Sequence, residues 1–311
     1  MRIVSLLPAA TEIVCAIGLE SELVAITSGC DWPPSIVGTP VVTRDRGEAT
    51  GSSGSTEASV SDAMHGGAAV LGLDHDALAA AHPDLILAQE RCRACGVDYG
   101  TVSDIARRID PAITVISLEP TSIEGILNAI STIGAMTESE DAAMDLVASF
   151  RERLRAIEDK VTERREEGHR GPRVVALGEL DPPYTAGHWI PEQIRRAGGW
   201  DVLGIDGGPA SPMSWERIIE VSPEILLVVP NDLHLADTVA RWERTSIPED
   251  AAMIPAVRAG AVLALDGAAY FSRPSPRIID GIELLAEVMD PPAFTDLAPG
   301  DGWVPVDLPQ S

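Results

Sequence analysis

The chain has 311 residues, 45% of them hydrophobic and 23% charged, which is the composition of a folded protein with room for two domains. Its 23 Lys and Arg face 48 Asp and Glu, giving a formal net charge of −25. A field of this sign repels nucleic acid and anionic lipid, so we exclude nucleic acid as a partner. The sequence contains no apolar run of about 18 residues, which argues against insertion into a membrane.

The amino terminus bears on the compartment. A secretory signal has a basic start, an apolar stretch of about 7–15 residues and a cleavage site with small side chains. Here the first apolar run ends at Pro8 and has the pattern of a strand over Arg2–Leu7. We therefore expect a cytoplasmic protein. A periplasmic or extracellular location is the alternative if a signal segment has been removed.

In the first half, apolar runs of strand length alternate with helical patterns, which is typical of βαβ units with a parallel sheet. The expected strands are Arg2–Leu7, Leu23–Thr27, Leu85–Gln89 and Thr114–Leu118. The expected helices are Ala10–Gly18, Ser61–Val70, His75–Ala81, one from Val102, and Ile123–Gly134, and a polar loop covers Arg44–Ser59.

The longest helical pattern covers Ser139–Arg165 and ends before Gly168. It is longer than the roughly 8–20 residues of an ordinary globular helix, so we predict a strut that joins two lobes. An ordinary crossover helix is the alternative.

The second half repeats the theme of the first. Its expected elements are the strands Arg173–Leu177, Ile225–Val229 and Ala261–Leu265 and the helices Ile190–Ala197, Trp215–Val221 and Pro276–Met289. His82–Leu87 and Ser222–Leu227 have the same order of helix end, proline, acid and strand. After Asp290, a tail rich in Pro and Gly is expected to wrap the surface.

These patterns predict an α/β fold with two Rossmann-like lobes, mainly parallel sheets and one long backbone helix between them. The predicted parts are an N-terminal lobe (1–136), the linking helix (137–168), a C-terminal lobe (169–290) and the tail (291–311). Ligands of open α/β sheets bind at the carboxyl ends of the strands, so two such lobes predict a ligand cleft.

Five segments together resemble the receptors that bind cobalamin or iron chelates for ABC importers. They are Arg2–Ile13, Pro83–Ile86, Ser117–Pro120, Ala186–Glu192 and Arg273–Arg277. The likeness extends over Met1–Met289 and is closest to the subgroup called cobalamin-binding proteins. The pattern of that subgroup, Cys-Asp-aromatic-Pro followed by Cys-x-x-Cys, stands here as Cys30–Pro33 and Cys92–Cys95.

The resemblance implies a periplasmic-binding-protein fold of class III, with two lobes on one long helix. It also implies a substrate-binding protein that takes a corrinoid such as cobalamin and has no catalytic cofactor. Delivery to an ABC permease is implied as well. In exported receptors of this kind, one acid on each lobe docks onto the permease, and the resemblance places Asp76 and Glu216 at those positions. Composition alone is the alternative explanation of a surface acid in so acidic a chain.

The cysteines offer a second kind of site. Cys30 follows the expected strand Leu23–Thr27, and Cys92 and Cys95 follow Leu85–Gln89. If these strands are parallel, the three thiols share one edge of a sheet, where they suit a soft metal ion or a cobalt or iron centre. Binding of haem, an iron chelate or a metal ion is therefore an alternative function. A thiol redox enzyme that uses Cys92 and Cys95 is another, and packed, reduced thiols are the structural alternative. Cys15, inside the first expected helix, is assigned to the core.

Candidate ligand contacts also lie near the expected strand ends. Tyr184 and Trp189 suit stacking on a flat macrocycle, and His188 suits a metal or an amide. The alternative is that His188 and Trp189 cap and support the next helix. Arg273 suits a carboxylate or phosphate, or else a surface ion pair. The other aromatic residues of the predicted wall are Trp32, Trp215, Tyr270 and Phe271.

Motifs of catalysis are missing from the sequence. It contains no dinucleotide fingerprint, no Walker loop, no nucleophile elbow and no zinc-protease motif. We therefore predict a binding protein and no enzyme.

Overall fold

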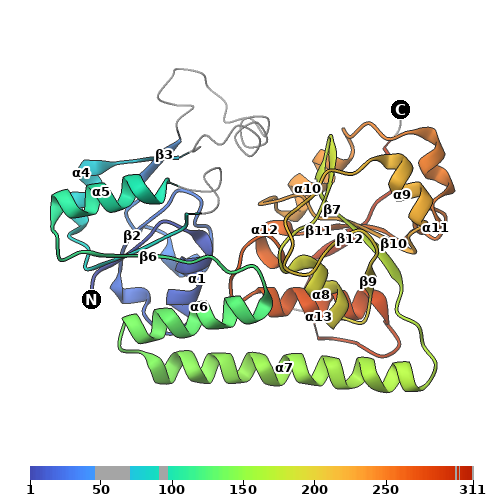
Figure 1. The fold of residues 1–311 in the computed structure, drawn as a ribbon, viewed down its shortest axis with the longest axis horizontal. Coiled ribbons are helices and arrows are strands. Elements are labelled where there is room, and N and C mark those ends of the chain that lie inside the picture. Colours follow the sequence, from blue (N-terminus) through green and yellow to red (C-terminus); the bar gives the residue numbers. More distant parts are fainter. Residues whose placement is uncertain (46–70, 91–96, 298–299, 301, 310–311) are drawn as a thin grey trace. The chain divides into compact units, whose positions relative to one another are not determined.

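The computed structural model describes residues 1–45, 71–90, 97–297, 300 and 302–309. The chain divides into two compact units (Figure 1). Unit 1 comprises Met1–Pro120 and Asn128–Leu146, and unit 2 comprises Thr121–Leu127 and Val147–Ser311. The chain therefore passes between the units three times, twice inside a continuous helix. The predicted domain boundaries stay a prediction.

Unit 1 is an α/β unit with a four-stranded sheet in the order β2-β1-β5-β6, parallel throughout. The strands are β1 (Ile3–Ser5), β2 (Leu23–Ile26), β5 (Leu85–Ala88) and β6 (Thr114–Ser117), and β3 (Thr43–Asp45) and β4 (Leu71–Leu73) form a separate antiparallel pair. Residues of β1 and β5 are buried on both faces, as a central parallel strand requires.

The helices of unit 1 and the two helices shared with unit 2 follow the expected positions closely. They are α1 (Pro8–Ala16), α4 (His75–Ala81), α5 (Tyr99–Ile109), α6 (Ile123–Met136) and α7 (Glu140–Glu166), with 3₁₀ turns η1 (Glu20–Glu22) and η2 (Pro34–Ile36). The expected helix Ser61–Val70 and most of the expected loop Arg44–Ser59 lie outside the described residues.

Unit 2 is built on a sheet in the order β12-β11-β10-β7-β8, with β9 also paired to β7. Strands β7, β10 and β11 are parallel, whereas β8 and β12 are antiparallel to their neighbours. The strands are β7 (Arg173–Leu180), β8 (Pro183–Thr185), β9 (Trp200–Asp201), β10 (Ile225–Val228), β11 (Val262–Leu265) and β12 (Trp303–Pro305). The helices are α8 (Ile190–Arg196), α9 (Trp215–Val221), α10 (Leu235–Trp242), α11 (Pro255–Arg258), α12 (Gly267–Tyr270) and α13 (Ile278–Met289), with the 3₁₀ turn η3 (Glu249–Met253). The prediction of α/β units with mainly parallel sheets is confirmed.

The tail differs from the prediction. Instead of only wrapping the surface, it adds β12 to the sheet, with Leu263 opposite Pro305 and Leu265 opposite Trp303. Beyond the strand, the backbone carbonyl of Asp307 accepts the indole N–H of buried Trp242 over 2.7 Å. A strand of three residues among Pro and Gly leaves too little pattern to be recognised in the sequence.

The internal repeat is present in the hydrogen bonds as well as in the sequence. In unit 1, Asp84 accepts the backbone N–H of Arg2 over 2.7 Å. In unit 2, Glu224 accepts the backbone N–H of Arg173 over 2.8 Å. In each unit the acid follows a helix end and a proline, so one carboxylate joins the start of the first strand to the next helix–strand segment.

The C-terminal part of α7, which belongs to unit 2, is held to the rest of this unit by ion pairs, and Figure 1 shows it beside α8 and α13. Arg153 reaches Glu283 on α13 over 2.8 and 2.6 Å and also pairs with Asp280. Glu158 pairs with Arg196 on α8, and Arg164 pairs with Asp290 over 2.7 Å. Contacts on three successive parts of the helix make this portion of α7 a rigid part of unit 2.

The start of α6 is also anchored in unit 2. The backbone N–H of Ile123 donates to Oε2 of Glu192 on α8 over 2.9 Å. The side chain of Glu192 is only 9% exposed, and its other oxygen accepts Nε of Arg196 over 2.9 Å. This buried carboxylate therefore satisfies one of the N–H groups that a helix start leaves without a partner inside the helix.

Candidate functional site

The carboxyl ends of β7, β10 and β11 meet at one edge of the sheet of unit 2, because these strands are parallel neighbours. Three loops leave this edge. They cover residues 181–189 after β7, which include the short strand β8, residues 229–234 after β10, and residues 266–273 after β11, which include the short helix α12. We refer to this edge and its three loops as the unit 2 edge. It is where an open α/β sheet presents groups to a ligand.

Two side-chain pairs fasten the loop after β10 to the loop after β11. Nε of Arg273 donates to Oδ1 of Asp232 over 3.0 Å, and Nδ1 of His234 lies 3.1 Å from Oδ1 of Asp266. The hydroxyl of Ser272 accepts the backbone N–H of Asp232 over 3.0 Å. These contacts hold the two loops as one surface.

In each pair, one side chain is much more exposed than the other. The side chain of Arg273 is 9% exposed and that of Asp232 is 57% exposed. The side chain of His234 is 47% exposed and that of Asp266 is 18% exposed. Asp266 also caps α12 by accepting the N–H of Ala269 over 2.8 Å. A fixed carboxylate therefore orients each basic group, and Asp232 and His234 face solvent.

His188 lies in a tightly folded loop after β8. Its backbone N–H donates to Gly208 over 2.6 Å, its carbonyl accepts the N–H of Gly207 over 2.8 Å, and its φ is +56°. Next to it, a Cβ at Gly187 would lie 2.5 Å from the backbone nitrogen of Ala210, so this approach requires glycine. The imidazole is exposed and stacks on Trp189, with 5.6 Å between the ring centroids.

Asp201, the last residue of β9, fixes the turn that leads toward Gly207 and Gly208, the two residues bonded to His188. Oδ1 of Asp201 accepts the N–H groups of Leu203 and Gly204 over 3.1 and 2.8 Å. Oδ2 is buried and has no hydrogen-bond partner among the described residues. Burial of this carboxyl raises its pKa to about 6. Asp201 therefore holds the turn at Leu203 and Gly204 in place with a carboxyl group that is costly to ionise.

Three aromatic residues of the predicted ligand wall lie in the interior of unit 2. Trp189 is 6% exposed and donates its indole N–H to the carbonyl of Phe271 over 2.6 Å, and Phe271 is fully buried. Trp215, at the start of α9, is 8% exposed and packs against Trp242. Their burial favours a packing role. For Trp189, this burial favours the alternative in which the side chain supports the next helix.

Tyr184 and Tyr270 are half-buried at the unit 2 edge. Tyr184 lies on β8 and is paired with Glu179 across the strands. Tyr270 ends α12, its carbonyl accepts the side-chain amide of Gln193 over 3.1 Å, and burial raises the pKa of its phenol. Their predicted contact with a ligand stays a prediction, as does that of His188.

In unit 1, the end of β2 places Cys30 against α1. Its sulfur lies 3.0 Å from the hydroxyl of Thr11, and Trp32, two residues on, is 44% exposed. Cys92 and Cys95 lie outside the described residues, so the predicted grouping of three thiols stays a prediction. Within the described part of the chain, no group of three or more His, Cys, Asp or Glu suits a metal ion. Cys15 is half-buried on α1 and not fully in the core, and burial raises the pKa of its thiol to about 12.

The two predicted docking acids occupy equivalent places. Asp76 is the second residue of α4, after the cap Asp74, and Glu216 is the second residue of α9, after the cap Ser214. Both side chains are exposed. A hydrogen bond from Ser214 lowers the pKa of Glu216, so its negative charge is stabilised. Their role in docking stays a prediction.

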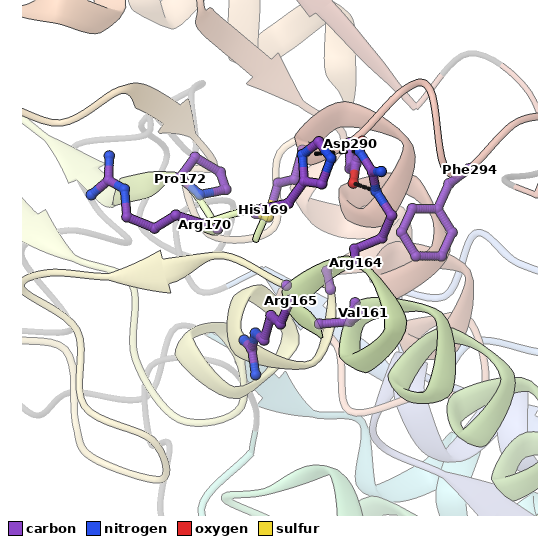
Figure 2. A pocket seen from close by; sticks show the side chains of 12 residues that line it. Val161, Arg164, Arg165, His169, Arg170, Pro172, Asp290 and Phe294 are labelled. Carbon is purple, nitrogen blue, oxygen red and sulfur yellow. Dashed lines mark hydrogen bonds and ion pairs between the residues drawn. The ribbon is translucent and has the colours of Figure 1, made fainter. Parts of the chain in front are cut away.

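A pocket of about 120 Å³ lies at the other end of the parallel strands in unit 2 (Figure 2). It lies between the end of α7, the segment before β7 and the end of α13. Arg164, His169 and Asp290 line it, and Val161, Met289 and Phe294 supply apolar surface. Arg164 is already paired with Asp290 and Glu167. None of the predicted ligand contacts lines this pocket.

Sequence reasoning missed three residues of the unit 2 edge: Asp232, His234 and Asp266. Each lies within six residues of the carboxyl end of an expected strand, and this position was the available signal. The partner of each is 32 or more residues away in the chain, so the pairs themselves could not be read from spacing.

The chain belongs to the periplasmic binding protein family, whose model matches residues 3–269. It is 22% identical over 282 residues to a vitamin B12-binding protein of Vibrio parahaemolyticus, covering 90% of this chain and 86% of that protein. It is 29% identical over 224 residues to a cobalamin-binding protein of Halobacterium salinarum, covering 70% of this chain and 54% of that protein. It is also 24% identical over 303 residues to the ABC transporter substrate-binding lipoprotein YvrC of Bacillus subtilis, covering 95% of this chain and 82% of that protein.

Solved structures share the fold. The periplasmic vitamin B12-binding protein BtuF of Vibrio cholerae has a TM-score of 0.63 and 21% identity, with 92% of this chain and 95% of that one covered. A periplasmic haem-binding protein of Pseudomonas aeruginosa has a TM-score of 0.68 and 20% identity, with 93% and 92% covered. The predicted two-lobed periplasmic-binding-protein fold is confirmed. Because the family consists of substrate-binding proteins, the prediction of a binding protein rather than an enzyme is confirmed as well.

The expected cytoplasmic location is wrong. The family is one of periplasmic binding proteins, and a matching relative is a substrate-binding lipoprotein of an ABC transporter. The expectation came from reading the first apolar run as a strand, and Ile3–Ser5 is indeed β1. A strand at that position is compatible with export and carries no information on the compartment. Within the described residues, the helices lack the length and apolar character needed to cross a membrane.

Proposed function

We propose that this protein binds a corrinoid of the cobalamin type for uptake through an ABC importer. The observation that carries the proposal is the likeness to proteins named for this ligand, including the 29% identity over 224 residues to the cobalamin-binding protein of Halobacterium salinarum. The vitamin B12-binding protein of Vibrio parahaemolyticus extends the likeness over 90% of the chain.

The unit 2 edge supplies chemistry that suits such a ligand. His188 and His234 offer imidazoles, and Tyr184 and Tyr270 offer half-buried rings. A corrinoid has a broad ring with amide groups around its rim. Aromatic rings and apolar surface bind the broad ring, and polar groups in fixed positions bind the amides at its rim. In unit 1, exposed Trp32 follows β2 and offers another flat surface.

Titration of the purified chain with cyanocobalamin tests the proposal. Absorbance and calorimetry should agree on one-to-one binding with a Kd in the micromolar range or below. Trp32→Ala should weaken binding by roughly tenfold or more, which is the effect of removing an aromatic anchor. The matched control is Trp200→Ala, because Trp200 is 59% exposed but lies beside Arg173 at the start of β7, the opposite edge of the sheet in unit 2.

Absence of any spectral or calorimetric change at about 50 μM cyanocobalamin would overturn the corrinoid proposal. Haem is the second candidate, favoured by the exposed His188 imidazole, which suits an iron centre. A parallel titration with haemin distinguishes the two. A shift of the haem Soret band without any response to cyanocobalamin would assign the protein to haem.

We also propose that Asp76 and Glu216 dock onto the permease. Their equivalent places in α4 and α9, at exposed helix starts, support this role. Charge reversal to Lys at both positions should abolish uptake in cells that carry the permease and leave ligand binding unchanged. Asp237→Lys, in the exposed first turn of α10, is the control and should leave uptake intact. Normal uptake by the double variant would contradict docking through these acids.

A further inference from the structure

The ion pair between Asp232 and Arg273 has a consequence for ligand choice, if the proposed corrinoid function holds. Corrinoids of the cobalamin type have neutral amides around the ring, whereas haem has two propionate carboxylates. A guanidinium is the side chain that binds a carboxylate most strongly, through two parallel hydrogen bonds. The state of the arginines at the unit 2 edge therefore bears on which ring is accepted.

Arg273 is committed to a carboxylate of the protein. Its side chain is 9% exposed, and its Nε donates to Oδ1 of Asp232 over 3.0 Å. Asp232 is itself fixed by the hydroxyl of Ser272, which accepts its backbone N–H. Breaking this pair for a ligand carboxylate would leave Asp232 as a second negative charge beside the first.

The other charges at the unit 2 edge add to this effect. Asp266 holds His234, and Arg277 lies near Asp280, whose pKa is raised by burial. Two more acids are close in the chain to this edge, since Glu179 lies near the carboxyl end of β7 and Asp181 directly follows that strand. Acids therefore outnumber arginines at this edge, which repels an anionic ligand and tolerates a neutral amide.

We propose that Asp232 is a specificity-determining residue. By holding Arg273 in an ion pair, it makes the unit 2 edge accept a macrocycle rimmed with amides and reject one rimmed with carboxylates. Removal of the charge at this position removes the competing carboxylate beside Arg273 and lowers the electrostatic cost of an anionic ligand. The inference rests on the proposed function, because it assumes that the unit 2 edge faces the ligand.

Two probes with the same corrin ring test the proposal. Dicyanocobinamide has amides around the ring, and dicyanocobyrinic acid has carboxylates. The native chain should bind dicyanocobinamide, the amide probe, at least about 100-fold more tightly than dicyanocobyrinic acid, the acid probe. Asp232→Asn keeps an oxygen for Nε of Arg273 but removes the charge. It should reduce the ratio of the two dissociation constants roughly tenfold, because the acid probe binds more tightly. Haemin should gain affinity in the same variant.

Two further variants control the comparison. Asp232→Glu keeps the charge and should keep the native ratio. Asp237→Asn removes an exposed acid in the first turn of α10 and should also keep it. Raising the salt concentration should reduce the ratio of the two dissociation constants for the native chain, because salt screens exposed charges. This last measurement needs no variant, so it tests the idea even if Asp232→Asn fails to fold.

The outcomes separate the two proposals. A native chain that binds neither dicyanocobinamide nor cyanocobalamin overturns the proposed function. A native chain that binds the amide probe, with an Asp232→Asn ratio equal to the native one, overturns only the role of Asp232. Equal loss of both probes in a folded Asp232→Asn protein also overturns it, since a direct contact would then explain the result.

Discussion

The side chain of Glu224 accepts the backbone N–H of Arg173 over 2.8 Å and thereby joins β7 to the segment before β10. Asp84 makes the matching bond to Arg2 in unit 1. Glu224→Ala should destabilise unit 2 by about 1–2 kcal/mol, because it removes a hydrogen bond to a charged group and leaves a strand N–H without its acceptor. Urea unfolding followed by circular dichroism measures the loss.

Glu224→Gln retains the acceptor oxygen and should restore much of the stability. Glu220→Ala is the matched control, since Glu220 is on the neighbouring α9 with a side chain that is 67% exposed. It should change stability little. An equal effect of Glu220→Ala and Glu224→Ala would contradict a special role of the bond to Arg173.

The clamp between α7 and α13 gives a second prediction. Arg153→Ala leaves Glu283, whose side chain is 10% exposed, and Asp280 without their cation. We expect a loss of about 2–3 kcal/mol near neutral pH. Burial already raises the pKa of Asp280 even with Arg153 beside it, and removal of the cation raises it further. The added stability cost is therefore small at low pH and grows as the pH rises through that pKa.

The measurement is urea unfolding of both proteins at about pH 4.5 and about pH 7.5. Arg217→Ala removes an exposed pair with Glu220 on α9 and serves as the control. A difference between native and Arg153→Ala proteins that does not depend on pH would show that lost packing, and not the unpaired carboxylates, causes the effect.

Trp189 gives a prediction that separates packing from ligand contact. Trp189→Phe removes the indole N–H that Phe271 accepts over 2.6 Å and leaves space in the interior of unit 2. It should lower stability by about 2–3 kcal/mol. Trp200→Phe changes a ring that is 59% exposed and should have a much smaller effect. Unaltered thermal unfolding of Trp189→Phe together with weaker cyanocobalamin binding would instead assign Trp189 to the ligand wall.

Asp201 predicts a dependence on pH. Because burial raises its folded-state pKa from the ordinary 3.8 to about 6, its favourable contribution is complete below about pH 4 and is lost as the pH rises to about 6. The loss is at most about 3 kcal/mol. Asp201→Asn keeps an oxygen for Leu203 and Gly204 and cannot ionise. Its stability relative to the native chain should therefore increase from pH 4 to pH 7, measured by thermal unfolding. A constant difference would contradict the raised pKa.

Much of the fold could be predicted because strong local signals mark its elements. The bounds of α4 and α9 agree with the expected His75–Ala81 and Trp215–Val221. Each of these helices has a capping side chain before it and a proline soon after its end, which are the clearest start and stop signals. By contrast, α10 (Leu235–Trp242) and β12 (Trp303–Pro305) were missed. Helix α10 starts after His234, which makes no capping hydrogen bond, and three residues of β12 are too few for a reliable period.

The site was less predictable, for a physical reason. An aromatic residue after a strand can line a ligand or pack under the next helix, and its own sequence neighbours do not distinguish the two. For Trp189 the decisive contact is a carbonyl 82 residues away, at Phe271. His234 and Asp266 likewise meet across 32 residues. The sequence places such groups at the correct edge of the sheet, and only the packed loops decide which of them meet.

The bond from the Ile123 N–H to Glu192 has a practical consequence for protein engineering. Unit 2 includes Thr121–Leu127, although the chain then returns to unit 1 until Leu146. A fragment expressed from Val147 onward would lack this strip and would leave Oε2 of the buried Glu192 without its donor. A split sensor or an isolated second lobe therefore has to carry residues 121–127 along, for example by fusing them through a new linker. A single cut between the lobes is insufficient.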